Sequence, residues 1–129
     1  MNGEYLLDTS VMIALFASDP TVTGRLRNMR EIFIPSIALG ELYYGAYRSN
    51  QLLKNVAIIE RFAASNVVLS CNADSARQYG EIKDRLRRKG HPIPENDIWI
   101  AAIALQHGLT LITRDAHFSA VEDLEVEMW

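Results

Sequence analysis

The fold is decided by residues 94–118, which run PENDIWIAAIALQHGLTLITRDAHF. The segment 98–105 is apolar on nearly every side, which predicts a helix that is packed on more than one face. After a turn, residues 109–113 combine apolar residues with threonine, as is typical of a buried strand in a parallel sheet. One acid stands at each end of this unit: Asp97 at the start of the helix and Asp115 just past the strand. Both positions can face the same edge of the sheet.

The composition indicates one folded domain spanning residues 1–129, with 49% hydrophobic and 22% charged residues. No apolar run approaches the roughly 20 residues that a membrane span needs. The beginning, MNGEYLLD, lacks the basic and apolar segments of a signal peptide. The single cysteine, Cys71, cannot form an internal disulfide and is expected to be a small core residue. We therefore expect a cytoplasmic protein with no membrane partner.

Strand-like and helix-like segments alternate along the chain. The expected strands are residues 4–8, 31–35, 67–69, 109–113 and, at an edge, 124–128. The expected helices begin near residue 10 and then cover residues 21–29, 36–48, 51–64, 72–89 and 98–105. This alternation predicts an α/β fold: a three-layer α/β/α sandwich around a mainly parallel sheet.

Four acids occupy comparable places in this pattern. Asp8 follows the first strand, Glu41 lies in the helix after the second, Asp97 begins a helix and Asp115 follows the fourth strand. Such positions can converge at the carboxyl edge of the sheet, where open α/β sheets bind their ligands. Clustered carboxylates repel one another unless a cation neutralises them, and oxygen ligands suit Mg²⁺ or Mn²⁺. We expect a divalent metal site there.

Two of these acids also have a simpler structural interpretation, and two neighbouring polar residues could support the others. Asp8 could serve only to cap the following helix, and Glu41 could be a solvated surface residue. Thr113 could hold Asp115 or a bound water through its hydroxyl, and Asn96 could hold Asp97 or cap its helix. The sequence alone leaves these alternatives open.

The net charge of −3 does not exclude a nucleic-acid partner, because the basic residues are clustered. Five of the thirteen are Lys83, Arg85, Arg87, Arg88 and Lys89, at the end of the helix 72–89. They could complement the helix dipole or hold phosphates. The three histidines are expected in loops or turns, since none lies in a nucleophile motif: His91, His107 and His117.

Four motifs carry a resemblance to a known family. They are YLLDTSVMIAL, PSIALGELYYGA, NDIWIAAIAL and LITRDAHF, and a closing LEVEMW follows them. Their order and spacing over the whole chain resemble a PIN-domain protein, and more closely a VapC-type ribonuclease toxin of a toxin–antitoxin pair. The resemblance implies a PIN-like fold and a divalent-metal endoribonuclease that cuts a structured RNA.

On this resemblance Asp8, Glu41, Asp97 and Asp115 would bind Mg²⁺ or Mn²⁺, with Thr113 in support. Many family members have asparagine in place of Asp115, so a charge there is not obligatory. A metal-activated water would attack the phosphorus. The expected phosphate contacts are Arg85, Arg87, Arg88 and Arg114. The resemblance also implies a homodimer or a toxin–antitoxin hetero-oligomer, with a basic side chain of the antitoxin entering the acidic groove.

Other functions fit less well. A haloacid-dehalogenase phosphatase needs a second acid two residues after the first, where this chain has Ser10. A receiver domain needs an acid after the third strand, where Ser70 and Cys71 stand. The remaining alternative is a non-catalytic PIN-like binding module for RNA or a partner protein.

Overall fold

A computed structural model describes residues 4–129 of the chain. Its strands are β1 (Tyr5–Leu7), β2 (Ile32–Pro35), β3 (Val67–Leu69), β4 (Thr110–Thr113) and β5 (Val126–Met128). Its α-helices are α1 (Thr9–Phe16), α2 (Pro20–Arg27), α3 (Ser36–Tyr47), α4 (Leu52–Ala64), α5 (Ala73–Lys89) and α6 (Glu95–His107). A short 3₁₀ helix, η1 (Ala116–Ala120), precedes β5.

The five strands form one sheet in the order β3-β2-β1-β4-β5, and every pairing is parallel. The first strand is therefore the central one, with β2 on one side and β4 on the other. The register sets Leu6 beside Phe33 of β2 and Leu111 of β4. The predicted class is confirmed, and the sheet is wholly parallel because β5 also runs alongside β4 in the same direction.

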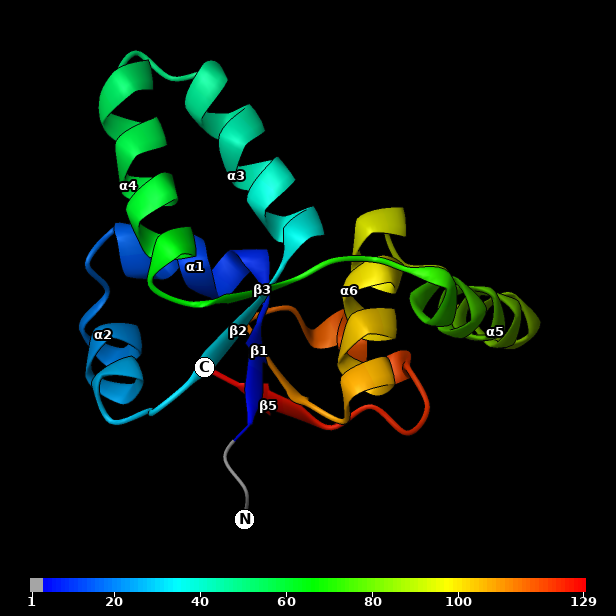
Figure 1. The fold of residues 1–129 in the computed structure, drawn as a ribbon. Coiled ribbons are helices and arrows are strands. Elements are labelled where there is room, and N and C mark those ends of the chain that lie inside the picture. The colour runs from blue at the N-terminus through cyan, green and yellow to red at the C-terminus, as the bar shows by residue number, and fades with distance from the viewer. Residues whose placement is uncertain (1–3) are drawn as a thin grey trace.

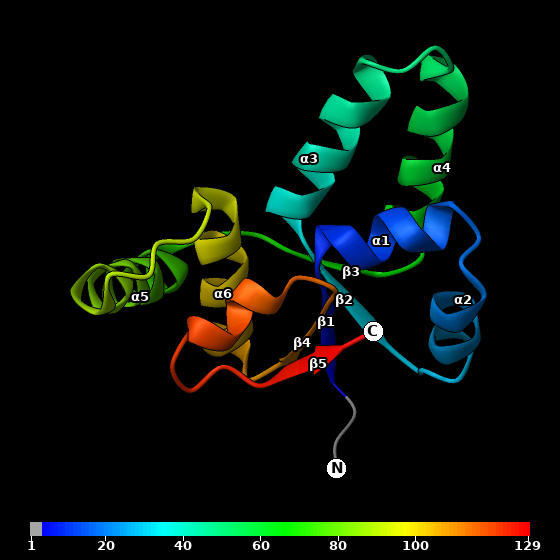
Figure 2. The ribbon, with the colours of Figure 1, turned by 180° about the vertical axis from the view of Figure 1, so that it is seen from behind.

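The helices cover both faces of the sheet. Right-handed crossovers put α1 to α4 on one face and α5, α6 and η1 on the other. Figures 1 and 2 show this division from opposite sides, with α3 and α4 projecting as a hairpin and α5 lying alongside α6 at the other flank. This arrangement is the predicted three-layer sandwich.

The core explains why residues 98–105 are so apolar. The α6 residues Ile100 to Ala104 are fully buried, because α6 packs on the sheet and is also covered by α5. Gly108, with φ +65°, ends α6 in the left-handed conformation that favours glycine. The helix begins at Glu95, one turn earlier than predicted, and two acids in its first turn favour that extension through the helix dipole.

The other helix ends follow similar rules. Asn72 caps α5 in a capping box with Ser75, and Gly90 closes the helix, as predicted. Asp19 caps α2, whose first residue is Pro20. Across residues 4–129, no helix is both long and apolar enough to span a bilayer.

Candidate active site

The strand order brings the predicted acids to one edge of the sheet. The strand order reverses at β1, because the chain continues from β1 to β2 on one side and later returns to β4 on the other side. Asp8 directly follows β1, and Asp115 lies two residues after β4. The helices α3 and α6, which carry Glu41 and Asp97, pack against each other above this point. Ligands of open parallel sheets bind in such a crevice.

Asp8 is a buried carboxylate, only 1% exposed. Its Oδ2 accepts hydrogen bonds from Thr113 Oγ1 at 2.7 Å and from Ser10 Oγ at 2.9 Å. Although Asp8 holds the cap position of α1, its side chain makes no capping bond. The interpretation of Asp8 as a mere helix cap is therefore wrong, and its carboxylate is fixed toward the site.

Thr113 connects the ends of the two central strands. It is fully buried, and its hydroxyl donates to Asp8 while it accepts the backbone N–H of Asp115 at 3.0 Å. Thr113 thus contacts Asp115 through the backbone N–H of that residue, whereas the carboxylate that its hydroxyl binds belongs to Asp8. Strand pairing explains the difference, because β1 and β4 are neighbours and their ends are level.

Glu41 is half-buried and has two partners. Its Oε1 accepts a hydrogen bond from Thr9 Oγ1 at 2.6 Å, and its Oε2 accepts one from Asn96 Nδ2 at 3.3 Å. Glu41 is thus no solvated surface residue. The expectation that Asn96 holds Asp97 or caps α6 is also wrong, because Asn96 reaches across to α3.

Asp97 lies among the other charges, with 14% of its side chain exposed. Burial raises the pKa of the Asp97 carboxyl above its ordinary value of 3.8. The hydrogen bond with His117 acts in the opposite direction, whereas the negative charges of Asp8 and Glu41 raise the pKa further. Asp8 and Glu41 therefore lie close enough for their charges to act on Asp97.

Asp115 completes the group together with a residue that the sequence did not reveal. Asp97, Asp115 and His117 each offer a ligand-type atom, and these atoms all lie within 4.8 Å of one another. His117 Nε2 is 2.6 Å from Asp97 Oδ2. The expected loop or turn role for His117 is therefore incomplete. Its position two residues after an acid that follows a strand is the signal that would have pointed to it.

The predicted phosphate contacts differ in their positions. Arg114 adjoins the acids: its N–H donates to Ser10 Oγ, and its guanidinium pairs with Asp19 at 3.0 Å. Val22 N–H and the Arg114 guanidinium lower the pKa of the Asp19 carboxyl.

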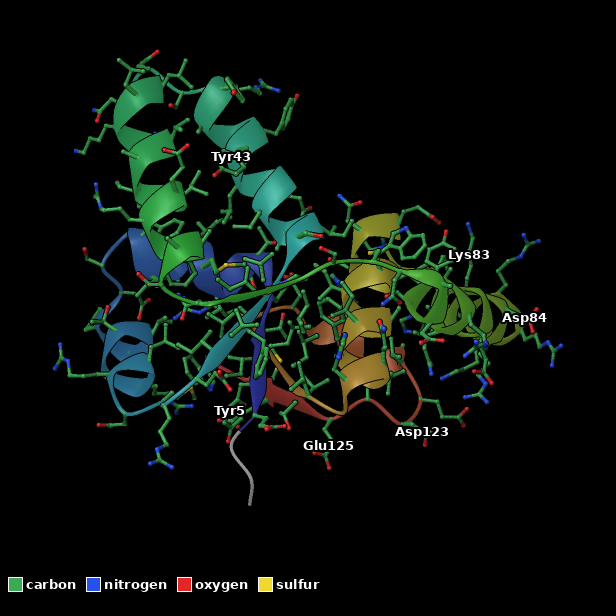
Figure 3. The ribbon with its side chains drawn as sticks, viewed as in Figure 1. Tyr5, Tyr43, Lys83, Asp84, Asp123 and Glu125 are labelled. Carbon is green, nitrogen blue, oxygen red and sulfur yellow. The ribbon has the colours of Figure 1, made fainter. Side chains whose placement is uncertain are left out.

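The arginines of α5 are engaged on the flank of the molecule. Arg85 pairs with Glu81 and Glu122, and Arg88 pairs with Asp84. Figure 3 shows α5, on which Lys83 and Asp84 are labelled, at the flank of the molecule. The structure therefore brings only Arg114, of the predicted arginines, next to the acids.

Two hollows adjoin the acids along α3. A cleft of about 660 Å³ includes Glu41 and Asn96 and is lined beyond them by Ile13, Gly40 and Tyr44. A more apolar groove of about 270 Å³ shares Glu41 and Ile13 but continues past Gly45 between α1, α3 and α4. Glu41 lies where the two meet.

The family model of the PIN domain matches residues 5–124. The chain belongs to the PIN-domain family. It is 36% identical to Ribonuclease VapC2 of Haemophilus influenzae and 33% identical to the tRNA(fMet)-specific endonuclease VapC of Shigella flexneri, with 98% of each chain covered in both comparisons. A DNA-bound VapBC complex from Salmonella typhimurium contains a chain that superposes with a TM-score of 0.91, at 30% identity and 98% coverage of both chains.

These findings confirm the resemblance to VapC-type members of the PIN-domain family and the predicted fold. They also confirm the expected enzyme class, because the relatives are named as ribonucleases. The expected association with an antitoxin agrees with structural neighbours that are VapBC complexes. The roles of individual residues in this chain are the subject of the proposal below.

Proposed function

We propose that this chain, as a single domain, is a divalent-metal-dependent endoribonuclease and the toxin of a toxin–antitoxin pair. The observation that carries the proposal is the convergence of four carboxylates on one edge of the sheet, with Asp97 electrostatically coupled to Asp8 and Glu41. Its relatives named as VapC ribonucleases support the same activity.

The donor set fits a hard divalent cation. Asp8, Glu41, Asp97 and Asp115 supply oxygen ligands from separate elements, which suits Mg²⁺ or Mn²⁺. When bound, such an ion supplies Lewis acidity, lowers the pKa of water and stabilises charge on a phosphodiester. Burial, followed by the charges of Asp8 and Glu41, raises the pKa of Asp97, and a bound cation would offset these effects by favouring the ionised carboxylate.

The remaining residues hold these carboxylates in place. Thr113 and Ser10 fix Asp8, while Thr9 and Asn96 fix the two oxygens of Glu41. Hydroxyl and amide donors of this kind orient ligands around a metal and tune their basicity. The carboxylates that would position the metal ion and an attacking water are thus held in a fixed geometry.

The substrate is a structured RNA, in keeping with a relative that is named as specific for a transfer RNA. The cleft beside Glu41 offers apolar and aromatic walls from Ile13 and Tyr44, which suit an unstacked base. Arg114 is the first candidate for a phosphate contact because of its position beside Ser10. Arg85, Arg87 and Arg88 could reach only RNA that extends over α5.

The partner is an antitoxin that covers the α3–α4 hairpin and the acids. Tyr44, Tyr47 and Leu53 expose large apolar side chains there, and Leu53 is 85% exposed. The apolar groove between α1, α3 and α4 provides a seat for apolar side chains of that partner. A basic side chain of the antitoxin would pair with the acids. We also propose a homodimer or a toxin–antitoxin hetero-oligomer.

Cleavage of a panel of structured RNAs, transfer RNAs included, in Mg²⁺ or Mn²⁺ tests the function. Loss of an orienting partner of a metal ligand costs about 10- to 100-fold, so Asp97→Asn, which alters a ligand itself, should slow cleavage by more than about 100-fold. Asp84→Asn is the matched control, since it makes the same change on the outer side of α5. Equal rates for Asp97→Asn and the parent protein would refute the proposed site. Tight RNA binding without cleavage under any metal condition would instead favour a non-catalytic binding module.

A further inference from the structure

His117 lies beside the acids of the site and offers a nitrogen atom where they offer oxygen atoms. Its Nε2 is 2.6 Å from Asp97 Oδ2, and its side chain is 32% exposed. Together with Asp97 and Asp115 it offers ligand atoms within 4.8 Å of one another. Ligands around a single ion are separated by distances of this order.

The local fold holds the imidazole in this place. Asp115 N–H is bound to the buried hydroxyl of Thr113, so the chain leaves β4 in a fixed direction. The next residues form η1, and Phe118 anchors that turn with no exposed surface. The ring of His117 lies 5.0 Å from the ring of Phe118, centre to centre. His117 is therefore presented to Asp97 by a short segment fixed at both ends.

We propose that His117 is a direct metal ligand through Nε2, which gives the centre one nitrogen donor beside its carboxylates. This inference rests on the proposed metal-dependent function but goes beyond it. A coordinating imidazole nitrogen carries no proton, so a proton on Nε2 would leave to solvent when the nitrogen binds the metal. Imidazole favours first-row transition ions, whereas Mg²⁺ prefers oxygen ligands and retained water. The centre should therefore select Mn²⁺ over Mg²⁺ more strongly than carboxylates alone would.

The other two histidines provide matched controls. His107 is exposed at the far end of α6 from Asp97, and His91 is exposed after α5. Asparagine at either position makes the same chemical change as His117→Asn, away from the acids.

The test is pulsed electron paramagnetic resonance of the tag-free, full-length protein loaded with Mn²⁺. A coordinated imidazole gives a ¹⁴N modulation in the echo, which should appear in the parent protein and in His107→Asn and His91→Asn. It should disappear in His117→Asn, and uniform ¹⁵N-histidine labelling of the parent should replace it with the ¹⁵N signal. The labelled parent shows without any substitution that the nitrogen belongs to a histidine, and retention of the signal in His107→Asn and His91→Asn then assigns it to His117.

Binding titrations with Mn²⁺ and Mg²⁺ provide the second readout. The ratio of the Mn²⁺ and Mg²⁺ dissociation constants should shift by about 10-fold or more in His117→Asn, toward equal affinity. An unchanged ratio would overturn the proposal. Mn²⁺ binding to the parent protein without a ¹⁴N signal would also overturn it. If that binding still depended on Asp97, the proposed function would remain intact. Mn²⁺ binding that survives Asp97→Asn would instead count against the proposed metal site.

Discussion

At the scale of single residues, the site is defined by hydroxyl groups as much as by acids. Asp8 and Thr113 are both buried, and one hydrogen bond joins them across the boundary between β1 and β4. A buried carboxylate that loses a donor bears a desolvation cost that a surface carboxylate does not. The acids were visible in the sequence because Asp8 and Asp115 follow strands, while Glu41 and Asp97 lie in helices that begin near the same edge of the sheet. Thr113 was also a candidate, but its bond to Asp8 was not predicted, since a partner across the sheet depends on the register.

Replacement of Thr113 by valine should show what that hydroxyl does. Valine keeps the shape but removes the bond to Asp8, so we expect cleavage or metal affinity to fall by about 10- to 100-fold. The free energy of unfolding should fall by about 1–3 kcal/mol because an acceptor in the core loses its donor. RNA cleavage rates and urea denaturation measure the two effects.

Thr113→Ser should recover most of the activity, because it restores the hydroxyl but not the methyl group. Thr110→Val is the control on the same strand, as Thr110 bonds to the exposed Glu125 rather than to an acid of the site. If Thr113→Val cleaves RNA at the parent rate, Thr113 has no part in holding Asp8 for catalysis.

At the scale of elements, α3 contributes to the acidic site, to the cleft and to the apolar groove. It carries Glu41 toward the acids, Gly40 onto the cleft and Gly45 onto the apolar groove. A Cβ at either glycine would meet no atom within 4 Å. Packing of the fold does not require glycine at either position, and the absence of side chains there leaves both hollows open.

Replacing each of the two glycines by leucine should distinguish the role of the cleft from the role of the apolar groove. Gly40→Leu projects a side chain into the cleft and should slow RNA cleavage while antitoxin binding is less affected. Gly45→Leu should weaken antitoxin binding while cleavage is retained. Both should stabilise α3 by about 1 kcal/mol, since glycine is a poor helix former. Cleavage assays and calorimetric titration with the antitoxin distinguish the two variants, and the same effect from both would contradict the assignment.

Elements were largely predictable from the sequence because their signals are local. The cap at Asn72 and the glycines that end α5 and α6 fixed the helix ends, and apolar runs marked the strands. Contacts between elements were not predictable in this way. Asn96 lies in a recognisable motif, yet it contacts Glu41 on α3, 55 residues away in sequence. His117 was overlooked for the same reason, since its partner Asp97 is on another element.

At the scale of the whole molecule, the site links stability to pH and metal. The folded state raises the pKa of Asp97, so it binds that proton more tightly than the unfolded chain. The stabilising contribution is complete below the ordinary value of 3.8 and is lost as pH rises through the folded-state pKa. The metal-free protein should therefore lose this contribution toward neutral pH.

Thermal and urea unfolding in chelator should show Asp97→Asn to be more stable than the parent protein at neutral pH. The difference should shrink as the pH falls. Comparison with this variant cancels the opposite contribution of Asp19, whose pKa is lowered in the folded state. Mn²⁺ at about 100 times its dissociation constant should add about 2.7 kcal/mol to the parent protein, because the ion binds only the folded chain.

Asp84→Asn should respond to Mn²⁺ as the parent does, whereas Asp97→Asn should respond far less. A parent protein whose unfolding is indifferent to Mn²⁺ and chelator would show that no ion is held by these acids.

The hydrogen bond from Thr113 to Asp8 spans 105 residues of sequence, and this separation has a consequence for protein synthesis. A ribosome delivers the chain from its N-terminal end, so Asp8 emerges long before the strand that must hold it. The central strand β1 has no β4 beside it until then, and Asp97 and Asp115 are also still to come. The proposed RNA-cutting centre would therefore stay incomplete throughout most of translation. On the proposed assignment of these acids, the order in which the parts of the chain are made would keep the growing chain from attacking RNA.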